Sequence, residues 1–290
     1  MTDHSTASPV SSAASADDYC QQKAAASGSS FYYSFLFLPP ERRQAIMALY
    51  AFCREVDDVV DECSDPTLAR AKLAWWRTEI AGLFEGKASH PVTQALATSI
   101  QRFDISQELL MEIIDGMEMD LDVARYGTFK DLGLYCYRVA SVVGLLAAEI
   151  FGYQDRQTLK YAHDLGMAFQ LTNIIRDVGE DARRGRIYLP VDELQRFNVP
   201  ANDLMQARYS DNFRDLMAFQ VERAQQYYDK AFAQLPAGDR KSQKAGLIMA
   251  AIYRATLEEI VRDGYQVLDQ RLSLTPIRKL WLATKTWLRY

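Results

Sequence analysis

The sequence predicts an all-α protein built as a single domain. From residue 17 onward, apolar residues recur at spacings of three and four within segments rich in Ala, Leu, Glu, Gln, Arg and Met, which is the pattern of amphipathic helices. No segment alternates convincingly as a half-buried strand does, and no Gly-rich turn between a strand and a helix is present. No break resembles a linker between two independent cores, so we expect one helical domain over residues 17–290.

Proline and glycine mark where the predicted helices begin and end. The breaks fall at residues 39–40, 65–66, 86–91, 127, 152, 185–190, 200, 236–238 and 276. Residues 1–16 are rich in Ser and Ala and carry no Lys or Arg, so we expect a disordered tail and not a signal peptide. No apolar run approaches the roughly eighteen residues that a membrane span needs.

Composition excludes several classes of protein. The 290 residues are 49% hydrophobic and 24% charged, with a formal net charge of −5, whereas nucleic-acid-binding proteins show a strongly basic face. Four cysteines have no metal-binding or redox spacing, which indicates a reduced, cytoplasmic protein. Three scattered histidines give no zinc site.

The segment YAFCREVDDVVDE, residues 50–62, places carboxylates beside an apolar helix face. At about 100° per residue, Ile46, Leu49, Cys53, Val56 and Val60 form the apolar stripe. Tyr50, Arg54, Asp57 and Asp61 form a second stripe beside it, and Glu55, Asp58 and Glu62 lie further round, towards solvent. Asp57 and Asp61 are neighbours at spacing i, i+4, so this is a polar strip at the margin of a core.

The same arrangement returns in QLTNIIRDVGEDARRGRIYLP, residues 170–190. Gln170, Asn173, Asp177 and Asp181 share one stripe, with Arg176 next to Asp177. One such pair alone is typical of a solvated helix with ion pairs. Two matching pairs repel one another without cations, and Mg²⁺ takes carboxylate and phosphate oxygens, while arginine binds phosphate in a bidentate fork. The sequence therefore predicts a cavity between helices that binds a diphosphate through Mg²⁺.

At these residues the chain resembles the squalene/phytoene synthase family of head-to-head prenyl transferases. The resemblance runs from about residue 18 to about residue 285, through YAFCREVDDVVD, NIIRDVGEDARRGRIYLP, YCYRVASVVG and SGSSFYYSFLFLPPERR. Within the family, REVDDVVDECSDP, AKLAWWR, EIIDGMEMDLD and SLTPIRKLW are similar to the bacterial presqualene diphosphate synthases of hopanoid synthesis. The resemblance implies the type I isoprenoid synthase fold, with helices around a central cavity.

The resemblance also implies roles for individual residues. It implies two to three Mg²⁺ ions held with the diphosphate by Asp57, Asp61, Asn173, Asp177 and Asp181. It implies diphosphate contacts from Arg54, Gln170, Arg176, Arg186, Tyr188 and Arg271, and a reacting centre lined by Ser30, Phe31, Tyr50, Tyr135 and Tyr253. The four aspartates, Tyr188, Arg54 and Arg176 are the implied catalytic group. Asp120 matches an acidic position near the site, and Ser141 stands where many relatives have glycine, so we expect a slightly narrower cavity.

The activity implied is condensation of two farnesyl diphosphates to presqualene diphosphate and pyrophosphate, without NADPH. Phytoene formation from geranylgeranyl diphosphate, and squalene or dehydrosqualene formation, stay open, because the long aspartate motif is common to all of them. A non-catalytic helical assembly factor is a further alternative, against which the four aspartates argue.

The C-terminal segment TPIRKLWLATKTWLRY brings Ile277, Leu280, Trp281 and Leu288 near one another on a helix, among Arg278, Lys279, Lys285 and Arg289. Two interpretations stay open here. The helix lies on the inner face of the cell membrane, or it packs on the protein body with its basic residues in water.

Overall fold

The computed structural model describes residues 15–26 and 30–290, and within these residues it contains helices and no strands. The all-α prediction is confirmed. Residues 1–14 of the predicted tail lie outside the described residues, and the first helix begins at Ala16. The helices are α1 Ala16–Ala26, α2 Ser30–Phe35, α3 Pro40–Glu62, α4 Pro66–Phe84, α5 Pro91–Ile100, α6 Gln107–Asp122, α7 Phe129–Cys136, η1 Tyr137–Ser141, α8 Val142–Phe151, α9 Gln157–Arg183, α10 Val191–Arg196, α11 Ala201–Met205, α12 Asp211–Gln234, η2 Ala237–Asp239, α13 Lys244–Arg262 and α14 Pro276–Arg289.

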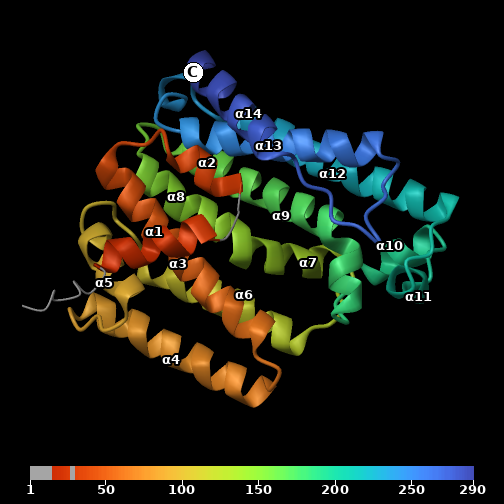
Figure 1. Cartoon of the computed structure of the whole chain (residues 1–290), viewed down its shortest axis with the longest axis horizontal. Helices are drawn as coiled ribbons and strands as arrows, with labels where there is room; N and C mark the ends of the chain where they lie inside the picture. Colours follow the sequence, from red (N-terminus) through yellow and green to blue (C-terminus); the bar gives the residue numbers. More distant parts are fainter. Residues whose placement is uncertain (1–14, 27–29) are drawn as a thin grey trace, which may run out of the picture.

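Helix α9 is the axis around which the other helices are arranged (Figure 1). It packs along α12 and also contacts η1, α8, α13, α7 and α11. In Figure 1, α12, α13 and α14 lie on one side of α9, and α3, α6 and α4 lie on the other. One predicted aspartate pair therefore lies on the central helix α9, and the other lies on α3, to one side of it.

Several of the predicted breaks coincide with the first residue of a helix. Helices α3, α4, α5 and α14 each begin with a proline, whose missing N–H costs nothing in the first turn. The Asp65 side chain accepts a hydrogen bond from the Thr67 N–H at 2.8 Å and so caps α4. Thr128 and Asp131 form a reciprocal capping box at the start of α7.

Helices α7, η1 and α8 run without interruption from Phe129 to Phe151. By length and composition this stretch of 23 residues, which contains an 18-residue window with a mean hydropathy of 1.5, can cross a membrane, so the expectation that no run is long enough is wrong. In the structure it packs against α6 and α9, as the central helix of a core does. Its middle segment η1 is a π-helical turn, a feature frequent at functional sites.

Glycine allows α9 to lie directly on this helix. A Cβ at Gly166 would come within 2.6 Å of the Ala140 carbonyl oxygen, so the two backbones touch at this point. The neighbouring Ser141 is buried and donates its hydroxyl to the His163 carbonyl at 2.9 Å. Since Ser141 faces α9 and does not line the central cavity, the expectation that it narrows the cavity is wrong.

The turn between α4 and α5 is held by one buried carboxylate. Glu79 accepts hydrogen bonds from the backbone N–H groups of Ser89 and His90 and from the Ser89 hydroxyl, each at 2.7 Å, and from the Thr93 hydroxyl. Burial acts to raise the pKa of Glu79, but these four bonds favour the charged form and lower the pKa to about 2.

This carboxylate gives the fold a specific acid sensitivity. Because the pKa falls from 4.5 to about 2 on folding, the stabilisation is complete above pH 4.5 and is lost as the pH drops through 2. We predict that Glu79→Gln lowers the melting temperature at pH 7 and flattens its fall between pH 5 and pH 2. Thermal melts followed by circular dichroism test this, with exposed Glu85→Gln as the control. Parallel acid curves for the wild type and Glu79→Gln would contradict it.

Candidate active site

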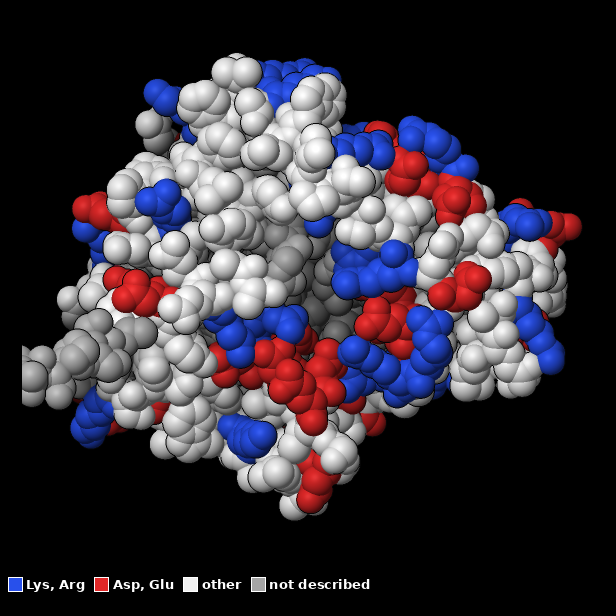
Figure 2. Space-filling model, in the orientation of Figure 1, with Lys and Arg blue, Asp and Glu red and all other residues white. Residues whose placement is uncertain are grey.

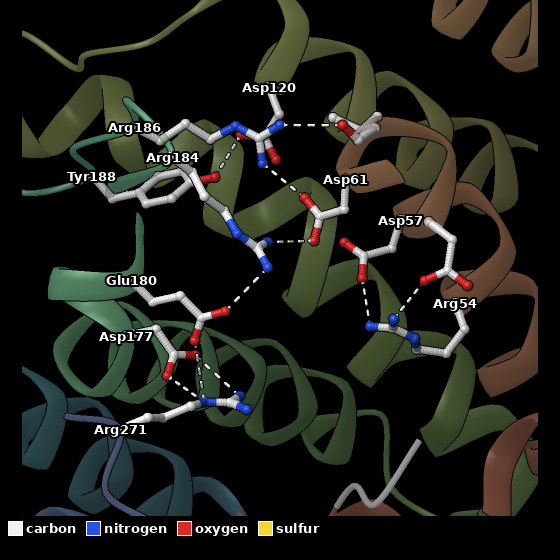
Figure 3. A network of polar contacts seen from close by, with 12 residues as sticks. Arg54, Asp57, Asp61, Asp120, Asp177, Glu180, Arg184, Arg186, Tyr188 and Arg271 are labelled. Atoms are coloured by element: carbon white, nitrogen blue, oxygen red, sulfur yellow. Dashed lines mark hydrogen bonds and ion pairs between the residues drawn. The ribbon is translucent and has the colours of Figure 1, made fainter. Parts of the chain in front are cut away.

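The carboxylates of three helices meet at one opening. Asp57 and Asp61 come from α3, Asp120 from α6, and Asp177 and Asp181 from α9. Figure 2 shows acidic and basic side chains gathered around a hollow near the middle of one face. Arg184 spans this opening, because its guanidinium lies 3.0 Å from Asp61 on α3 and 3.1 Å from Glu180 on α9 (Figure 3).

On α3, Arg54 holds the first aspartate of the pair. Its guanidinium donates to Asp57 at 2.6 Å and also to Asp58, one helical turn away. Burial raises the pKa of Asp57 to about 6, which Arg54 opposes and the neighbouring charge of Asp61 reinforces. The Asp57 carboxylate therefore binds protons more tightly than an exposed one and gains from a cation nearby.

The acidic residues on the far side of α3 do not all face solvent. Lys23 on α1 lies 2.9 Å from both Glu55 and Asp58, and the Tyr19 hydroxyl donates to Glu55 at 2.6 Å. Glu62 is exposed as expected. The expectation that Glu55 and Asp58 point to solvent is wrong, because α1 packs over this face of α3.

Asp61 is held by the loop that follows α9. Arg186 donates to one Asp61 oxygen at 2.9 Å, and Arg184 donates to the other. The loop is fixed by backbone hydrogen bonds, with Ile187 N–H donating to the Ala124 carbonyl at 3.2 Å. A second such bond, from Val191 N–H to the Tyr126 carbonyl, is 2.9 Å long. The segment after α6 thus places the arginines opposite α3.

Asp177 is paired with two arginines. Arg176 donates to both carboxylate oxygens, at 2.7 and 2.5 Å, and Arg271 donates to one of them at 2.9 Å. Burial acts to raise the pKa of Asp177, but hydrogen bonds and charge from Arg176 and then Arg271 lower it overall. The two arginines therefore favour the ionised form of Asp177.

A glycine brings Arg271 into position. The loop between α13 and α14 crosses α9 at Gly179, whose N–H donates to the Val267 carbonyl. The Leu268 carbonyl accepts from Arg183 at 2.6 Å, and a Cβ on Gly179 would come within 2.0 Å of that carbonyl oxygen. Only a residue without a side chain allows this approach, which carries the loop to Asp177.

Two side chains on α9 have oxygen atoms without a hydrogen-bonding or ion-pair partner among the described residues. The Asn173 side-chain oxygen is buried without a hydrogen bond, and the Asp181 carboxylate makes no hydrogen bond or ion pair. Burial and then the charges of Asp177 and Glu180 raise the pKa of Asp181 to about 7. The two groups lie about two helical turns apart on α9, and each is an oxygen ligand of the kind that a hard cation takes.

No group of three or more His, Cys, Asp or Glu in the described part of the chain is close enough to hold a metal ion by itself. The two aspartate pairs lie on opposite sides of the opening. This arrangement fits ions that take only one or two protein carboxylates each and complete their shell with phosphate oxygens and water.

Asp120 joins two tyrosines below the opening. The Tyr135 hydroxyl donates to Asp120 at 2.9 Å and the Tyr188 hydroxyl at 2.8 Å, and the two rings stack at 5.1 Å. Burial raises the pKa of Asp120 to about 6, opposed by Arg186 and by the two tyrosine hydrogen bonds. Burial also raises the pKa of both tyrosines, so their hydroxyls stay protonated.

An apolar cavity of about 180 Å³ runs from the polar opening into the core. Gln170 and Asn173 line its polar end, where the Asn173 amide donates to Gln170 at 3.3 Å. Phe151, Tyr161 and Gln243 are among its lining residues at the other end of the neighbouring helices. The cavity is bounded by α2, α3, η1, α8, α9 and α13. It fits an elongated hydrocarbon with a polar head.

Phe31, Tyr50 and Phe169 line one side of this cavity, and Tyr253 packs behind Phe31 and Phe169. Phe31 packs against Tyr50 and Tyr253 with ring centroids 5.7 Å apart, and Phe169 lies 4.8 Å from Tyr253. Ring faces stabilise a nearby positive charge. The side chain of Ser30, expected at the same place, lies outside the described residues.

The structure brings most of the predicted site residues to one region, and adds others. The predicted residues found there are Phe31, Tyr50, Arg54, Asp57, Asp61, Tyr135, Gln170, Asn173, Arg176, Asp177, Asp181, Arg186, Tyr188, Tyr253 and Arg271. Sequence reasoning missed Arg184 and Phe169. The run DARRGR signalled Arg184, but nothing in the helical pattern separated Phe169 from an ordinary core residue.

The helices, the apolar cavity and the paired carboxylates at its mouth define a helical isoprenoid synthase. The structure is similar to a solved dehydrosqualene synthase, with a TM-score of 0.84 and 29% identity, covering 94% of this chain and 96% of that one. It is also similar to the squalene synthase HpnC of Alicyclobacillus acidocaldarius, with a TM-score of 0.77 and 29% identity over 86% and 94% of the two chains.

Sequence comparison identifies the family. The squalene/phytoene synthase family model matches residues 24–278. The 15-cis-phytoene synthase of Synechocystis sp. is 34% identical over 98% of this chain and 88% of its own length. The phytoene synthase of Arthrospira platensis is 37% identical over 87% and 86%. The chain belongs to the squalene/phytoene synthase family, and it is a prenyltransferase of that family.

The contact at Gly179 allows a direct test of how Arg271 is positioned. We predict that Gly179→Ala displaces the loop, because a Cβ would overlap the Leu268 carbonyl. Release of pyrophosphate from a prenyl diphosphate should fall about tenfold, the scale of one lost charged contact of about 1.5 kcal/mol.

The control is Gly133→Ala on α7, where no atom lies within 4 Å of the added Cβ. This variant should keep full activity and gain slightly in helix stability. In the Gly179→Ala background, Arg271→Ala should have little further effect. Independent, multiplying losses from the two substitutions would contradict the positioning role of the loop.

Proposed function

We propose that this protein joins two molecules of farnesyl diphosphate head to head, giving presqualene diphosphate and pyrophosphate. The observation that carries the proposal is the position of paired carboxylates and arginines at the mouth of an apolar cavity with an aromatic wall. A charged head is thereby bound next to a dry hydrocarbon tail, which is the chemistry of a prenyl diphosphate.

The diphosphate would be bound by the aspartates and arginines of the opening, which form ion pairs with one another in this structure. We assign Asp57, Asp61, Asn173, Asp177 and Asp181 as the residues that hold two to three Mg²⁺ ions with the diphosphate. When bound, these ions supply positive charge that stabilises the departing diphosphate. Arg54, Arg176, Arg186 and Arg271 each contact an aspartate of this set, so metal binding releases their donors for phosphate oxygens. Gln170 and Tyr188 border the same opening.

The hydrocarbon side of the site serves the carbocation. The allylic C–O bond of the first substrate breaks, and its electron pair leaves with the diphosphate. The faces of Phe31, Tyr50 and Phe169, with Tyr253 packed behind them, stabilise the resulting cation and exclude water from it. The C2–C3 double bond of the second substrate attacks the cation, the released pyrophosphate takes up the proton that is lost, and the cyclopropane closes.

The length of the prenyl chain depends on how deep the cavity is. Phe151, Tyr161 and Gln243 lie at its inner end, and all three are buried. The similarity to a dehydrosqualene synthase and a squalene synthase supports a C15 substrate. Phytoene formation from a C20 substrate is the second candidate, because the curated relatives cited above are named phytoene synthases.

Product analysis separates the two candidates. The purified protein is incubated with farnesyl or geranylgeranyl diphosphate, with Mg²⁺ or with a chelator, and with or without NADPH. We predict presqualene diphosphate from the C15 substrate, only with Mg²⁺ and unchanged by NADPH. Phytoene from the C20 substrate would support the second candidate. Squalene formed with NADPH would mean that reduction follows, and no product from either substrate would leave a non-catalytic role.

The inner end of the cavity gives a prediction about specificity. Phe151 also lines an outer pocket of about 560 Å³, so it separates the cavity from that pocket. Phe151→Ala should join the two spaces and raise the ratio of C20 to C15 turnover by about tenfold, the effect of roughly 1.4 kcal/mol in transition-state binding.

The matched control is Phe213→Ala on α12, which removes an equally buried ring that does not line the cavity. Both substitutions should destabilise the fold by about 3–5 kcal/mol, so activity is measured well below both melting temperatures. An equal change of the C20 to C15 ratio in the two variants would show that Phe151 does not limit chain length.

A further inference from the structure

Helix α14 lies at the outer edge of the molecule and carries the C-terminus (Figure 1). The helix packs against α13 and α2, and Ala283 is its one fully buried residue, so only a small part of its surface is covered. Four large apolar side chains of the same helix are exposed: Ile277 by 82%, Leu288 by 72%, Trp281 by 57% and Leu280 by 48%. At 100° per residue these four fall within one stripe about 100° wide, turned away from Ala283. We call this the apolar stripe.

A basic stripe runs beside it. Arg278, Lys285 and Arg289 fall within about 40° of one another on the helix surface, adjacent to Trp281. Lys285 lies 4.8 Å from the Trp281 ring, and Arg289 lies 5.5 Å from the Tyr290 ring. Arg278 is paired with Glu259, but among the described residues Lys285 and Arg289 have no carboxylate within 4 Å.

Positive charge continues on the adjoining surface. Trp287 of α14 lines the outer pocket together with Arg42, Lys241 and Lys244. Lys244 donates to the Trp287 carbonyl at 3.2 Å and lies 5.2 Å from its ring. The helix end and the protein body thus present one face that is both apolar and basic.

We propose that α14 docks lengthwise on an anionic lipid bilayer, with the apolar stripe among the acyl chains and the basic stripe at the headgroups. Exposed apolar side chains gathered on a single helix face mark a site of interaction with a membrane or a protein. The positive charge of the basic stripe indicates which of these binds. A partly basic face beside Leu, Ile and Trp is complementary to an anionic interface and repels a cationic one. A second copy of this chain would bring two sets of unpaired cations together.

The docked orientation has a consequence that rests on the proposed function. Phe151 lies between the outer pocket under Trp287 and the inner end of the apolar cavity. The C-terminal part of the docked helix would therefore place the bilayer next to the inner, hydrocarbon end of the cavity. Substrates and products with long prenyl tails partition into such a bilayer.

The test is sedimentation with vesicles. The full chain is mixed with vesicles of phosphatidylcholine and phosphatidylglycerol, or of phosphatidylcholine alone, at low and high salt. We expect binding to the anionic vesicles, weakened by salt, and about tenfold less binding for the double variant Ile277→Ser/Leu288→Ser. Lys285→Gln/Arg289→Gln should remove most of the preference for anionic lipid.

The matched control is Leu68→Ser/Leu134→Ser, which changes two leucines that are each 49% exposed on α4 and α7. This variant should bind vesicles as the wild type does. The proposal would be overturned if Ile277→Ser/Leu288→Ser and Leu68→Ser/Leu134→Ser lost vesicle binding equally, or if the wild type did not bind vesicles. It would also be overturned if the wild type were a dimer that Ile277→Ser/Leu288→Ser converts to a monomer. Product formation in the absence of vesicles is measured separately, so failure of the proposed function and failure of docking are distinguishable.

Discussion

Mutual repulsion between the carboxylates of α3, α6 and α9 is the constraint on which the rest of this structure depends. Five aspartates share one opening above an apolar core, where burial and then the neighbouring carboxylates raise the pKa of Asp57 and Asp120 to about 6 and of Asp181 to about 7. Arginines balance this charge from four places: from α3, from α9, from the loop after α9, and from the loop before α14. Asp181 and Asn173, which no arginine reaches, mark where positive charge is still missing.

The scaffold is built to keep these charges apart and yet facing one another. Backbone contacts made possible by Gly166 and Gly179 fix α9 against η1 and against the loop that carries Arg271. Hydrogen bonds from the loop after α9 to the segment after α6 fix Arg186 opposite Asp61. These backbone contacts fix where the side chains of Arg186 and Arg271 begin, and the hydrogen bonds to Asp61 and Asp177 orient their guanidinium groups. The site is therefore preorganised before a ligand enters.

The charged groups and the apolar groups of the site occupy different parts of the molecule. Charged groups occupy the opening, aromatic rings line the upper wall of the cavity, and buried Phe151 and Tyr161 close its inner end. Beyond that end lie the basic pocket and the exposed stripe of α14. This order, from charge to hydrocarbon to basic surface, matches an amphiphilic substrate taken from or returned to an interface.

The sequence by itself determined the helices, their starts at prolines, and the i, i+4 spacing of Asp57–Asp61 and Asp177–Asp181, because these features depend on residues a few positions apart. It also indicated Arg54 and Arg176, which are neighbours of their aspartates in the chain. Only the tertiary structure decided that Arg184 and Arg186 reach Asp61, that Asp120 joins Tyr135 to Tyr188, that α1 covers Glu55, and that Ser141 turns to α9. Helical periodicity gives the direction of a side chain relative to its own axis. Which helix it meets there is set by packing between segments far apart in the chain, and no local pattern contains that information.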